Sequence, residues 1–326
     1  MKILLTGGAG YIGSHVVRSL TAAGHEPVVY DNLSAGHAAA VEPATLVVGD
    51  TADGEALVSA LRDHRIEAVI HLAAHIEAGE SVRRPGKYFR NNAVGSLTLL
   101  EAMRSAGVGT LVFSSTAAVY GQPRRVPIRE DDPTDPINPY GASKLCTEYM
   151  LRGFAEAYGM GFVSLRYFNV AGAAPEGDIG EDHDPETHLI PLVLQVPLGR
   201  RQSVKVFGDD YDTPDGTCVR DYIHVADLAA AHVLALQAAE AGRVKVFNLG
   251  NGDGFSVRQV IDACRQAAGH PIPAEPAPRR PGDPPTLVAS AEKARQQLGW
   301  QPQYPDLATI VAHAWAWHSA HPDGYD

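Results

Sequence analysis

Tyr140 and Lys144 have the residue types and the spacing of an acid–base pair. They are four positions apart, so a helix would place both on one face. A phenol has a pKa of about 10, and a tyrosine base needs a nearby cation to work near neutrality. The Lys144 ammonium would favour the phenolate. Pro139 directly before the pair favours a helix start, although the same spacing also fits an ordinary surface pair.

A glycine-rich segment near the start of the chain has the spacing of a phosphate-binding loop. Gly7, Gly10 and Gly13 form G-x-x-G-x-x-G, and Gly8 with the last two forms the narrower G-x-G-x-x-G. Glycine permits a tight turn and lets the backbone approach a pyrophosphate. The N-terminus of the following helix would bind the phosphates through free N–H groups and its positive dipole end. An ordinary strand-to-helix turn is the alternative interpretation.

Asp31 supports the dinucleotide interpretation. It ends the second apolar run, at about the 20-residue distance past the glycines where an acid hydrogen-bonds the adenosine ribose. A carboxylate at that place repels a 2′-phosphate, so we expect NAD rather than NADP. Asn32, Asp50 and Thr51 also follow strands, and we expect them near the ribose and adenine because ligands bind at the carboxyl ends of parallel strands.

Three consecutive hydroxyl side chains follow the apolar run at 111–114. Ser114, Ser115 and Thr116 would point into the ligand crevice if that run is a strand of a parallel sheet. The two serines fit strand-end capping equally well. Thr116 is the residue that we expect to hydrogen-bond a substrate hydroxyl.

Short apolar runs alternate with longer amphipathic stretches in the first half of the chain. We expect strands at residues 3–5, 27–30, 45–48, 68–72, 111–114 and 162–167, and helices at 12–23, 54–63, 94–105 and 143–157. The strands lack polar alternation, which indicates burial on both faces. This order predicts an α/β fold with a Rossmann-type parallel sheet covered by helices on both faces.

The pattern of residue types along the sequence changes after about residue 174. We expect a dinucleotide-binding domain at 1–174 and a smaller mixed α/β substrate domain at 175–326, with part of 219–250 packing on the first domain. Within the second region we expect helices at 189–199, 225–238, 256–268 and 307–318, extended segments at 203–207 and 244–249, and loops at 209–216 and 271–285.

The bulk properties restrict the class of partner and the compartment. The chain has 326 residues and a formal net charge of −11, so it lacks the positive charge that drives nucleic-acid binding. Its cysteines, Cys146, Cys218 and Cys264, are too few for a disulfide framework. No signal peptide and no bilayer-spanning apolar run are recognisable. We therefore expect a cytoplasmic protein that binds neither nucleic acid nor membrane.

Several longer segments carry a family resemblance over essentially the whole chain. They are TGGAGYIGSH (6–15), GESV (79–82), FSSTAAVYG (113–121), PYGASK (139–144), LRYFNVAGA (165–173), GEDHDPETHLIP (180–191), FGDDYDTPDGTCVRDYIHVADLA (207–229), NLGNG (248–252) and RRPGD (279–283). In these segments the chain closely resembles the extended short-chain dehydrogenase/reductase family, and within it the UDP-glucose (UDP-galactose) 4-epimerases.

The resemblance implies a role for each matching residue. Tyr140 would be the general base for the C4 hydroxyl, Lys144 would lower its pKa and bind the nicotinamide ribose, and Thr116 would hydrogen-bond O4. Besides the glycines and this pair, the matching coenzyme positions are Tyr11, Ile12, Asp31, Asn32, Asp50, Thr51, Leu72, Ala73, Asn91 and Phe168. The matching UDP-sugar positions are Asn169, Leu189, Lys205, Phe207, Arg220, Arg280 and Asp283.

The implied reaction is removal of hydride from C4 to NAD, rotation of the resulting 4-keto sugar, and return of hydride to its other face. The resemblance also implies a homodimer, formed by the helices near 94–103 and 145–154. Two positions depart from the pattern. Ile76 stands where a lysine is common, which puts one coenzyme phosphate contact in doubt. Leu287 stands where some members have a bulky tyrosine, so we expect room for an N-acetyl group at C2 of the sugar.

Other activities of related proteins fit the residues less well. Dehydratases and decarboxylases place an acidic pair after the position of Thr116, whereas this chain has Ala117 and Ala118. Epimerases of UDP-uronic acids stay open as an alternative, and a non-catalytic NAD sensor would lack the tyrosine and lysine. His71 and His75 are four apart, but we expect them on a strand end and its loop, where this spacing does not form a metal site. We therefore predict no metal.

Overall fold

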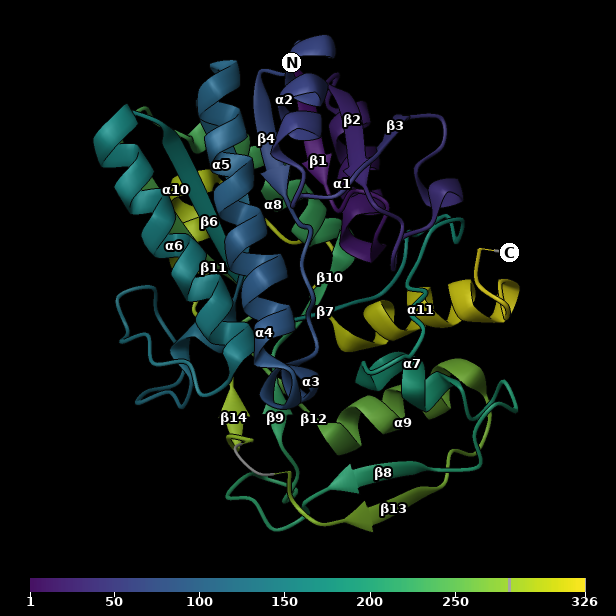
Figure 1. Ribbon diagram of the computed structural model, residues 1–326. Helices are drawn as coiled ribbons and strands as arrows, with labels where there is room; N and C mark the ends of the chain where they lie inside the picture. The colour runs from purple at the N-terminus through teal and green to yellow at the C-terminus, as the bar shows by residue number, and fades with distance from the viewer. Residues whose placement is uncertain (281–282, 326) are drawn as a thin grey trace.

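The computed structural model describes residues 1–280 and 283–325 of the chain. Its centre is a seven-stranded parallel sheet in the order β11-β6-β5-β4-β1-β2-β3. The strands are β1 (Lys2–Thr6), β2 (Glu26–Asp31), β3 (Thr45–Val48), β4 (Ala68–His71), β5 (Thr110–Thr116), β6 (Gly161–Tyr167) and β11 (Val244–Leu249). This is the Rossmann-type sheet that the sequence predicts (Figure 1).

Helices cover the sheet on both faces because its strands are apolar on both sides. Ile3 and Leu5 of β1 pack into one core with α1 (Tyr11–Ala22) and α8 (Val225–Ala238). Leu4, between them, packs into the opposite core with α2 (Gly54–Asp63), α5 (Gly95–Ala106) and α6 (Pro139–Tyr158). Successive side chains of a strand point to opposite faces, so both layers of helices are stabilised by burial of apolar surface.

A third core forms the lower part of the molecule in Figure 1. It includes residues of α7 (Leu189–Leu194), β8 (Val204–Phe207), α9 (Val257–Ala268) and α11 (Leu307–Ala320). β13 (Ala274–Ala277) pairs with β8, and β14 (Thr286–Leu287) and β12 (Phe255–Ser256) flank β9 (Val219–Arg220). β10 (Tyr222–His224) pairs with β7 (Asn169–Ala171), which directly follows the central strand β6.

Shorter helical segments complete the described chain. They are η1 (Ala38–Val41), α3 (Ala78–Arg83), α4 (Pro85–Tyr88), the π-helical η2 (Phe89–Val94), η3 (Ala117–Tyr120) and α10 (Glu292–Leu298). Within the described residues, no helix is both long enough and apolar enough to cross a bilayer.

The structure corrects three expected boundaries. The helix expected at 189–199 ends at Leu194, ahead of Pro197, whose ring is incompatible with a helix interior. The loop expected at 271–285 contains β13, an edge strand that accommodates Pro276. Helix α6 begins at Pro139 rather than at 143, because the Asn138 side chain accepts a hydrogen bond from the Gly141 N–H at 2.9 Å and caps the helix.

Candidate active site

The glycine segment forms the turn from β1 into α1 and has no room for a side chain at Gly7 or Gly13. Gly7 adopts φ +73°, and a Cβ there would lie 2.5 Å from the Ala73 backbone nitrogen. At Gly13 a Cβ would lie 2.4 Å from the Gly7 carbonyl oxygen, whereas at Gly10 it would meet that oxygen at 3.5 Å. Gly10 is the N-cap of α1. The bare backbone and the free helix N-terminus fit a dinucleotide pyrophosphate.

Asp31 lies at the end of β2 beside this turn. One of its carboxylate oxygens accepts the Ala9 N–H at 3.0 Å, and the other accepts the Leu33 N–H at 2.9 Å. Each oxygen retains a second lone pair, and the residue lines the pocket described below, so Asp31 can still accept hydrogen bonds from a ribose. Asp50 lies outside that pocket; its carboxylate accepts from the Asn32 amide and from the Ala52 N–H.

Helix α6 carries the tyrosine and the lysine into the same pocket. The Lys144 ammonium donates to the Ser114 carbonyl oxygen at 2.9 Å and lies 5.0 Å from the centre of the Phe113 ring. Burial lowers the pKa of Lys144 to about 7. Burial raises the pKa of the Tyr140 phenol, and a hydrogen bond with the Thr116 hydroxyl opposes that rise. A phenolate at Tyr140 therefore needs positive charge beside it.

The hydroxyls at the end of β5 have different partners. The Ser115 hydroxyl donates to Glu148 at 2.7 Å, and Glu148 forms a buried ion pair with Arg166. The side chain of Ser115 thus belongs to a structural network rather than to the crevice. The hydroxyls of Ser114 and Tyr167 are hydrogen-bonded to each other, and both residues line the pocket. Thr116 lines it too, next to Tyr140.

One pocket of about 420 Å³ lies at the carboxyl edge of the sheet and unites most of the predicted coenzyme positions. The predicted residues that line it are Gly7, Gly10, Tyr11, Ile12, Gly13, Asp31, Asn32, Thr51, Leu72, Ala73, Asn91, Thr116, Tyr140, Lys144, Phe168 and Asn169. Ile76, the departure from the family pattern, also lines it. The glycine turn and the tyrosine–lysine pair therefore share one cavity.

The comparisons with known proteins agree with this geometry. The model of the NAD dependent epimerase/dehydratase family matches residues 3–250. The chain belongs to this family. A UDP-glucose 4-epimerase of Halalkalibacterium halodurans is 57% identical over 326 residues, which is 100% of this chain and 98% of that protein.

Solved structures of family members have the same fold. A crystal structure of a UDP-glucose 4-epimerase is 51% identical, covers 100% of both chains and has a TM-score of 0.97. The epimerase from Bifidobacterium longum in complex with NAD+ and UDP is 40% identical, with a TM-score of 0.95 over 99% of this chain and 100% of that one. A UDP-Glc/GlcNAc 4-epimerase from Campylobacter jejuni is 42% identical, with a TM-score of 0.85 over 98% and 99%.

Most predicted UDP-sugar positions lie outside the pocket, on β8, β9 and β14, at the start of α7, and between β13 and β14. Arg220 of β9 lies 3.8 Å from Asp283 and pairs in register with Leu287 of β14. The Arg280 guanidinium lies 4.1 Å from the centre of the Phe207 ring on β8. On the same strand Lys205 is exposed, and Leu189 starts α7. These residues come from four chain segments that the fold brings to one side of the molecule.

The pocket has one wall that the residue-by-residue predictions missed. It consists of His183, Asp184, Pro185, Thr187 and His188, directly ahead of Leu189. The segment 180–191 was part of the family resemblance, yet only Leu189 was given a role. The signal that could have identified the wall is the pair of histidines: His183 lies between two aspartates, and His188 follows Glu186 by two positions.

His71 does not share a ligand set with His75. Its two ring nitrogens lie 2.6 Å from the Thr6 hydroxyl and 2.8 Å from the Ser96 hydroxyl, and burial lowers its pKa to about 3. Among the described residues, the group of histidines and acids with metal-ligand spacing is instead Glu181, His183, Glu186 and His188.

Proposed function

We propose that the protein reversibly inverts C4 of UDP-glucose and UDP-galactose with a bound NAD. The observation that carries this proposal is the single cavity shared by the dinucleotide-binding turn and the Tyr140–Thr116 pair. The full-length similarity to proteins named UDP-glucose 4-epimerase supports it. Ala117 and Ala118, next to the reacting group, cannot transfer protons, which favours epimerisation over dehydration.

When bound, NAD supplies the acceptor for the C4 hydride and the donor that returns it. We propose that it is held by the glycines at 7, 10 and 13, with Tyr11, Ile12, Asp31, Asn32, Asp50, Thr51, Leu72, Ala73, Asn91, Tyr140, Lys144 and Phe168 around it. Asp31 favours NAD over NADP because a carboxylate repels a 2′-phosphate. The close backbone approach at Gly7 and Gly13 fits the pyrophosphate.

Tyr140 takes the proton of the C4 hydroxyl and later gives it back. Its pKa is raised by burial, so the phenolate requires positive charge from Lys144 and from the coenzyme. Thr116 donates to or accepts from O4 and keeps it within reach of the phenol. The Lys144 ammonium, anchored on the Ser114 carbonyl, also binds the nicotinamide ribose. Because the sugar is oxidised and reduced within one site, no net redox change occurs.

The UDP group is held by the lower part of the molecule. We propose that Arg220 and Arg280 bind the pyrophosphate, since guanidinium groups pair with phosphates in bidentate geometry. Asn169, Leu189, Lys205, Phe207, Asp283 and Leu287 complete this site. Tight binding of UDP and weak binding of the hexose permit the 4-keto sugar to rotate within the site before hydride returns to its other face.

The test is incubation of the purified protein with UDP-galactose, UDP-N-acetylgalactosamine and UDP-galacturonate separately, without added NAD, followed by identification of the product sugars. Formation of UDP-glucose from UDP-galactose is the expected result. Exclusive turnover of UDP-galacturonate would replace the proposal with its main alternative, a UDP-uronate 4-epimerase.

We also propose that the enzyme accepts UDP-N-acetylhexosamines. Leu287 packs with Phe168 against Tyr120 and Leu145, and a tyrosine in its place would fill space near C2 of the sugar. Leu287→Tyr should abolish turnover of UDP-N-acetylglucosamine and retain turnover of UDP-glucose, as measured by product analysis. Absence of UDP-N-acetylglucosamine turnover in the unchanged enzyme would contradict this.

The homodimer, the compartment and the domain division are further proposals. Exposed apolar side chains on η2 and α6, including Val94 (54% exposed) and Tyr149 (58%), support pairing of these helices with a second copy. Elution at monomer mass in size-exclusion chromatography would contradict the homodimer.

The three free cysteines are consistent with a cytoplasmic location, which cell fractionation would test. We retain the division into 1–174 and 175–326; β11 and α8 nevertheless join the central sheet and its helical layer.

A further inference from the structure

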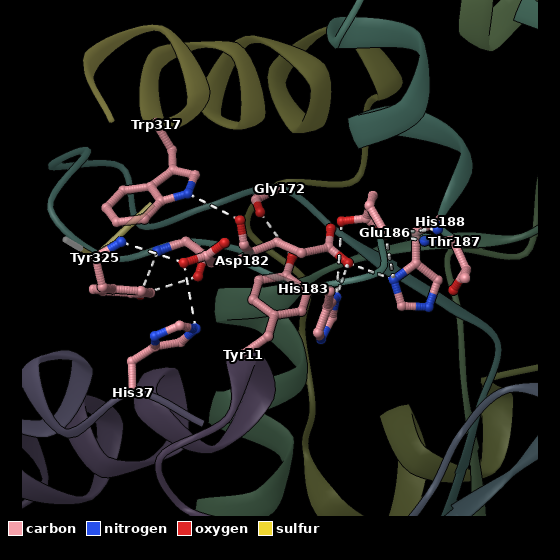
Figure 2. Close-up of polar contacts among 12 residues, drawn as sticks. Tyr11, His37, Gly172, Asp182, His183, Glu186, Thr187, His188, Trp317 and Tyr325 are labelled. Carbon is pink, nitrogen blue, oxygen red and sulfur yellow. Dashed lines mark hydrogen bonds and ion pairs between the residues drawn. The ribbon is translucent and has the colours of Figure 1, made fainter. Parts of the chain in front are cut away.

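The wall of the pocket between 181 and 188 gathers four side chains that can bind a metal. One ligand atom each from Glu181, His183, Glu186 and His188 lies within 4.8 Å of all the others. His183 Nδ1 lies 3.2 Å from Glu181 and 3.8 Å from Glu186. His188 Nδ1 is hydrogen-bonded to Glu181 and lies 3.8 Å from Glu186. Figure 2 shows the imidazoles of His183 and His188 directed toward the carboxylates.

These separations suit a tetrahedral divalent ion. Zinc binds imidazole nitrogen and carboxylate oxygen at about 2.0–2.2 Å, which places neighbouring ligand atoms about 3.4 Å apart around a tetrahedron. The observed separations of 3.2 and 3.8 Å bracket that value. The contact between Glu181 and His188 is shorter and would open to admit the ion.

The charges of the group also suit a dication. Two carboxylates with two neutral imidazoles carry the charge that balances Zn²⁺. The carboxylates of Glu181 and Glu186 are 3% and 7% exposed, so their attraction for an ion is screened little by water. The ring centres of the two imidazoles are 5.4 Å apart, so both rings can face one ion.

Surrounding contacts hold the ligands in place, as outer-shell partners do in metal sites. The indole of Trp317 donates to the Glu181 carbonyl oxygen at 3.0 Å. One oxygen of Glu186 accepts the backbone N–H groups of Thr187 and His188 at 2.6 and 2.7 Å, leaving its other oxygen toward His183. These contacts therefore fix the segment 181–188 on the side opposite the ligand atoms.

We propose that Glu181, His183, Glu186 and His188 form a binding site for a divalent ion of the zinc class at the edge of the coenzyme pocket. The ion cross-links the four ligands, so that residues 181–188 form one closed loop. The ring of His183 packs edge-on against Tyr11, with centres 6.2 Å apart, so the ion also fixes this wall against the first turn of α1. Its role is structural: it rigidifies the wall and takes no part in the proposed hydride transfer.

The test is metal uptake by tag-free protein, first stripped with a chelator and then titrated with ZnCl₂ in a calorimeter. We expect one ion per chain and a rise in Tm, because a ligand that binds the folded state stabilises it. His183→Gln and Glu186→Gln should each weaken binding more than about 100-fold, since even outer-shell partners contribute about 10- to 100-fold. His270→Gln, at an exposed histidine outside the group, should bind as the unchanged protein does.

Cobalt gives a measurement that needs no variant. Co²⁺ bound by two nitrogens and two oxygens in a tetrahedron produces intense visible absorption, whereas octahedral Co²⁺ is almost colourless. We expect the tetrahedral spectrum, displaced by stoichiometric zinc. No zinc uptake, an octahedral cobalt spectrum, or equal uptake by the His183 and Glu186 variants would each overturn the proposal. None of these outcomes depends on epimerase activity.

Discussion

The two ligand-binding regions of this molecule are built in different ways. The coenzyme side contains two motifs whose own residues are close together in sequence, namely the turn from β1 into α1 and the first turns of α6. The UDP side brings together β8, β9, β14 and residues near 280. Local spacing therefore identifies the coenzyme site directly, whereas nothing in local spacing links Phe207 to Arg280 or Arg220 to Leu287.

This difference has a physical cause. A helix fixes the relative positions of residues four apart, and a tight turn requires glycine at particular positions. The sequence itself therefore carries these constraints. Pairing between distant strands depends on how the complete chain folds, and many residues can occupy such positions. We expect substitutions on the coenzyme side to abolish chemistry or folding, and substitutions on the UDP side to alter substrate binding.

The largest effect is expected for Tyr140→Phe. General acid–base catalysis contributes about 10²- to 10⁴-fold, and the phenol lines the coenzyme pocket together with Thr116. We expect a loss of kcat of about 1,000-fold with dinucleotide content unchanged, measured by turnover and by absorbance of released coenzyme. Retention of more than a tenth of the activity would assign the proton transfer to another group.

Gly13→Ala tests how strictly the local turn is constrained. A Cβ at this position would overlap the Gly7 carbonyl oxygen at 2.4 Å, so we expect a loss of stability of about 1–3 kcal/mol and loss of bound dinucleotide. Gly10→Ala is the matched control, because its Cβ would meet the same oxygen at 3.5 Å and leave the fold intact. Equal Tm values for the two variants in thermal unfolding would contradict this view of the turn.

Arg280 and its neighbour Arg279 test where the pyrophosphate binds on the UDP side. Arg280 lies over the Phe207 ring, whereas Arg279 pairs with Asp210 at 2.6 Å on the surface. A hydrogen bond to a charged group contributes about 1.5–3 kcal/mol, so Arg280→Gln should raise KM about 10- to 150-fold with a small change in kcat. Arg279→Gln should leave KM unchanged. A similar KM for both variants would place the pyrophosphate elsewhere.

The stability of the protein should also depend on pH through Lys144. Burial lowers the pKa of Lys144 from 10.5 to about 7, so the unfolded chain binds the proton more tightly than the folded one. The free energy of unfolding therefore increases through Lys144 as pH rises from about 7 to 10.5. It decreases again as pH falls through that range. Lys144→Met should raise the Tm of dinucleotide-free protein at pH 7, with the advantage shrinking toward pH 10. A constant difference across that range would contradict the lowered pKa.

Regular, strongly patterned elements were the easiest to predict. The helices at 54–63 and 225–238 and the strand at 244–249 have the bounds expected from the sequence. The short segments α3, α4 and η2, between Ala78 and Val94, were not predicted, because they pack against neighbouring elements rather than follow a helical apolar period. The expectation that Ser115 points into the crevice was wrong, because successive side chains of a strand point to opposite faces and the Ser115 side chain reaches Glu148.

The sequence by itself determined the parallel sheet, the glycine turn and the placement of Tyr140 and Lys144 on one helix. Apolar runs, glycine conformations and helical spacing act over a few residues, so they can be interpreted along the chain. The tertiary structure decided which residues of the later segments meet, such as Arg220 with Asp283. It also decided that the wall at 181–188 closes the coenzyme pocket with its histidines turned toward two buried acids. Contacts of this kind depend on the packing of distant elements, which no local spacing records.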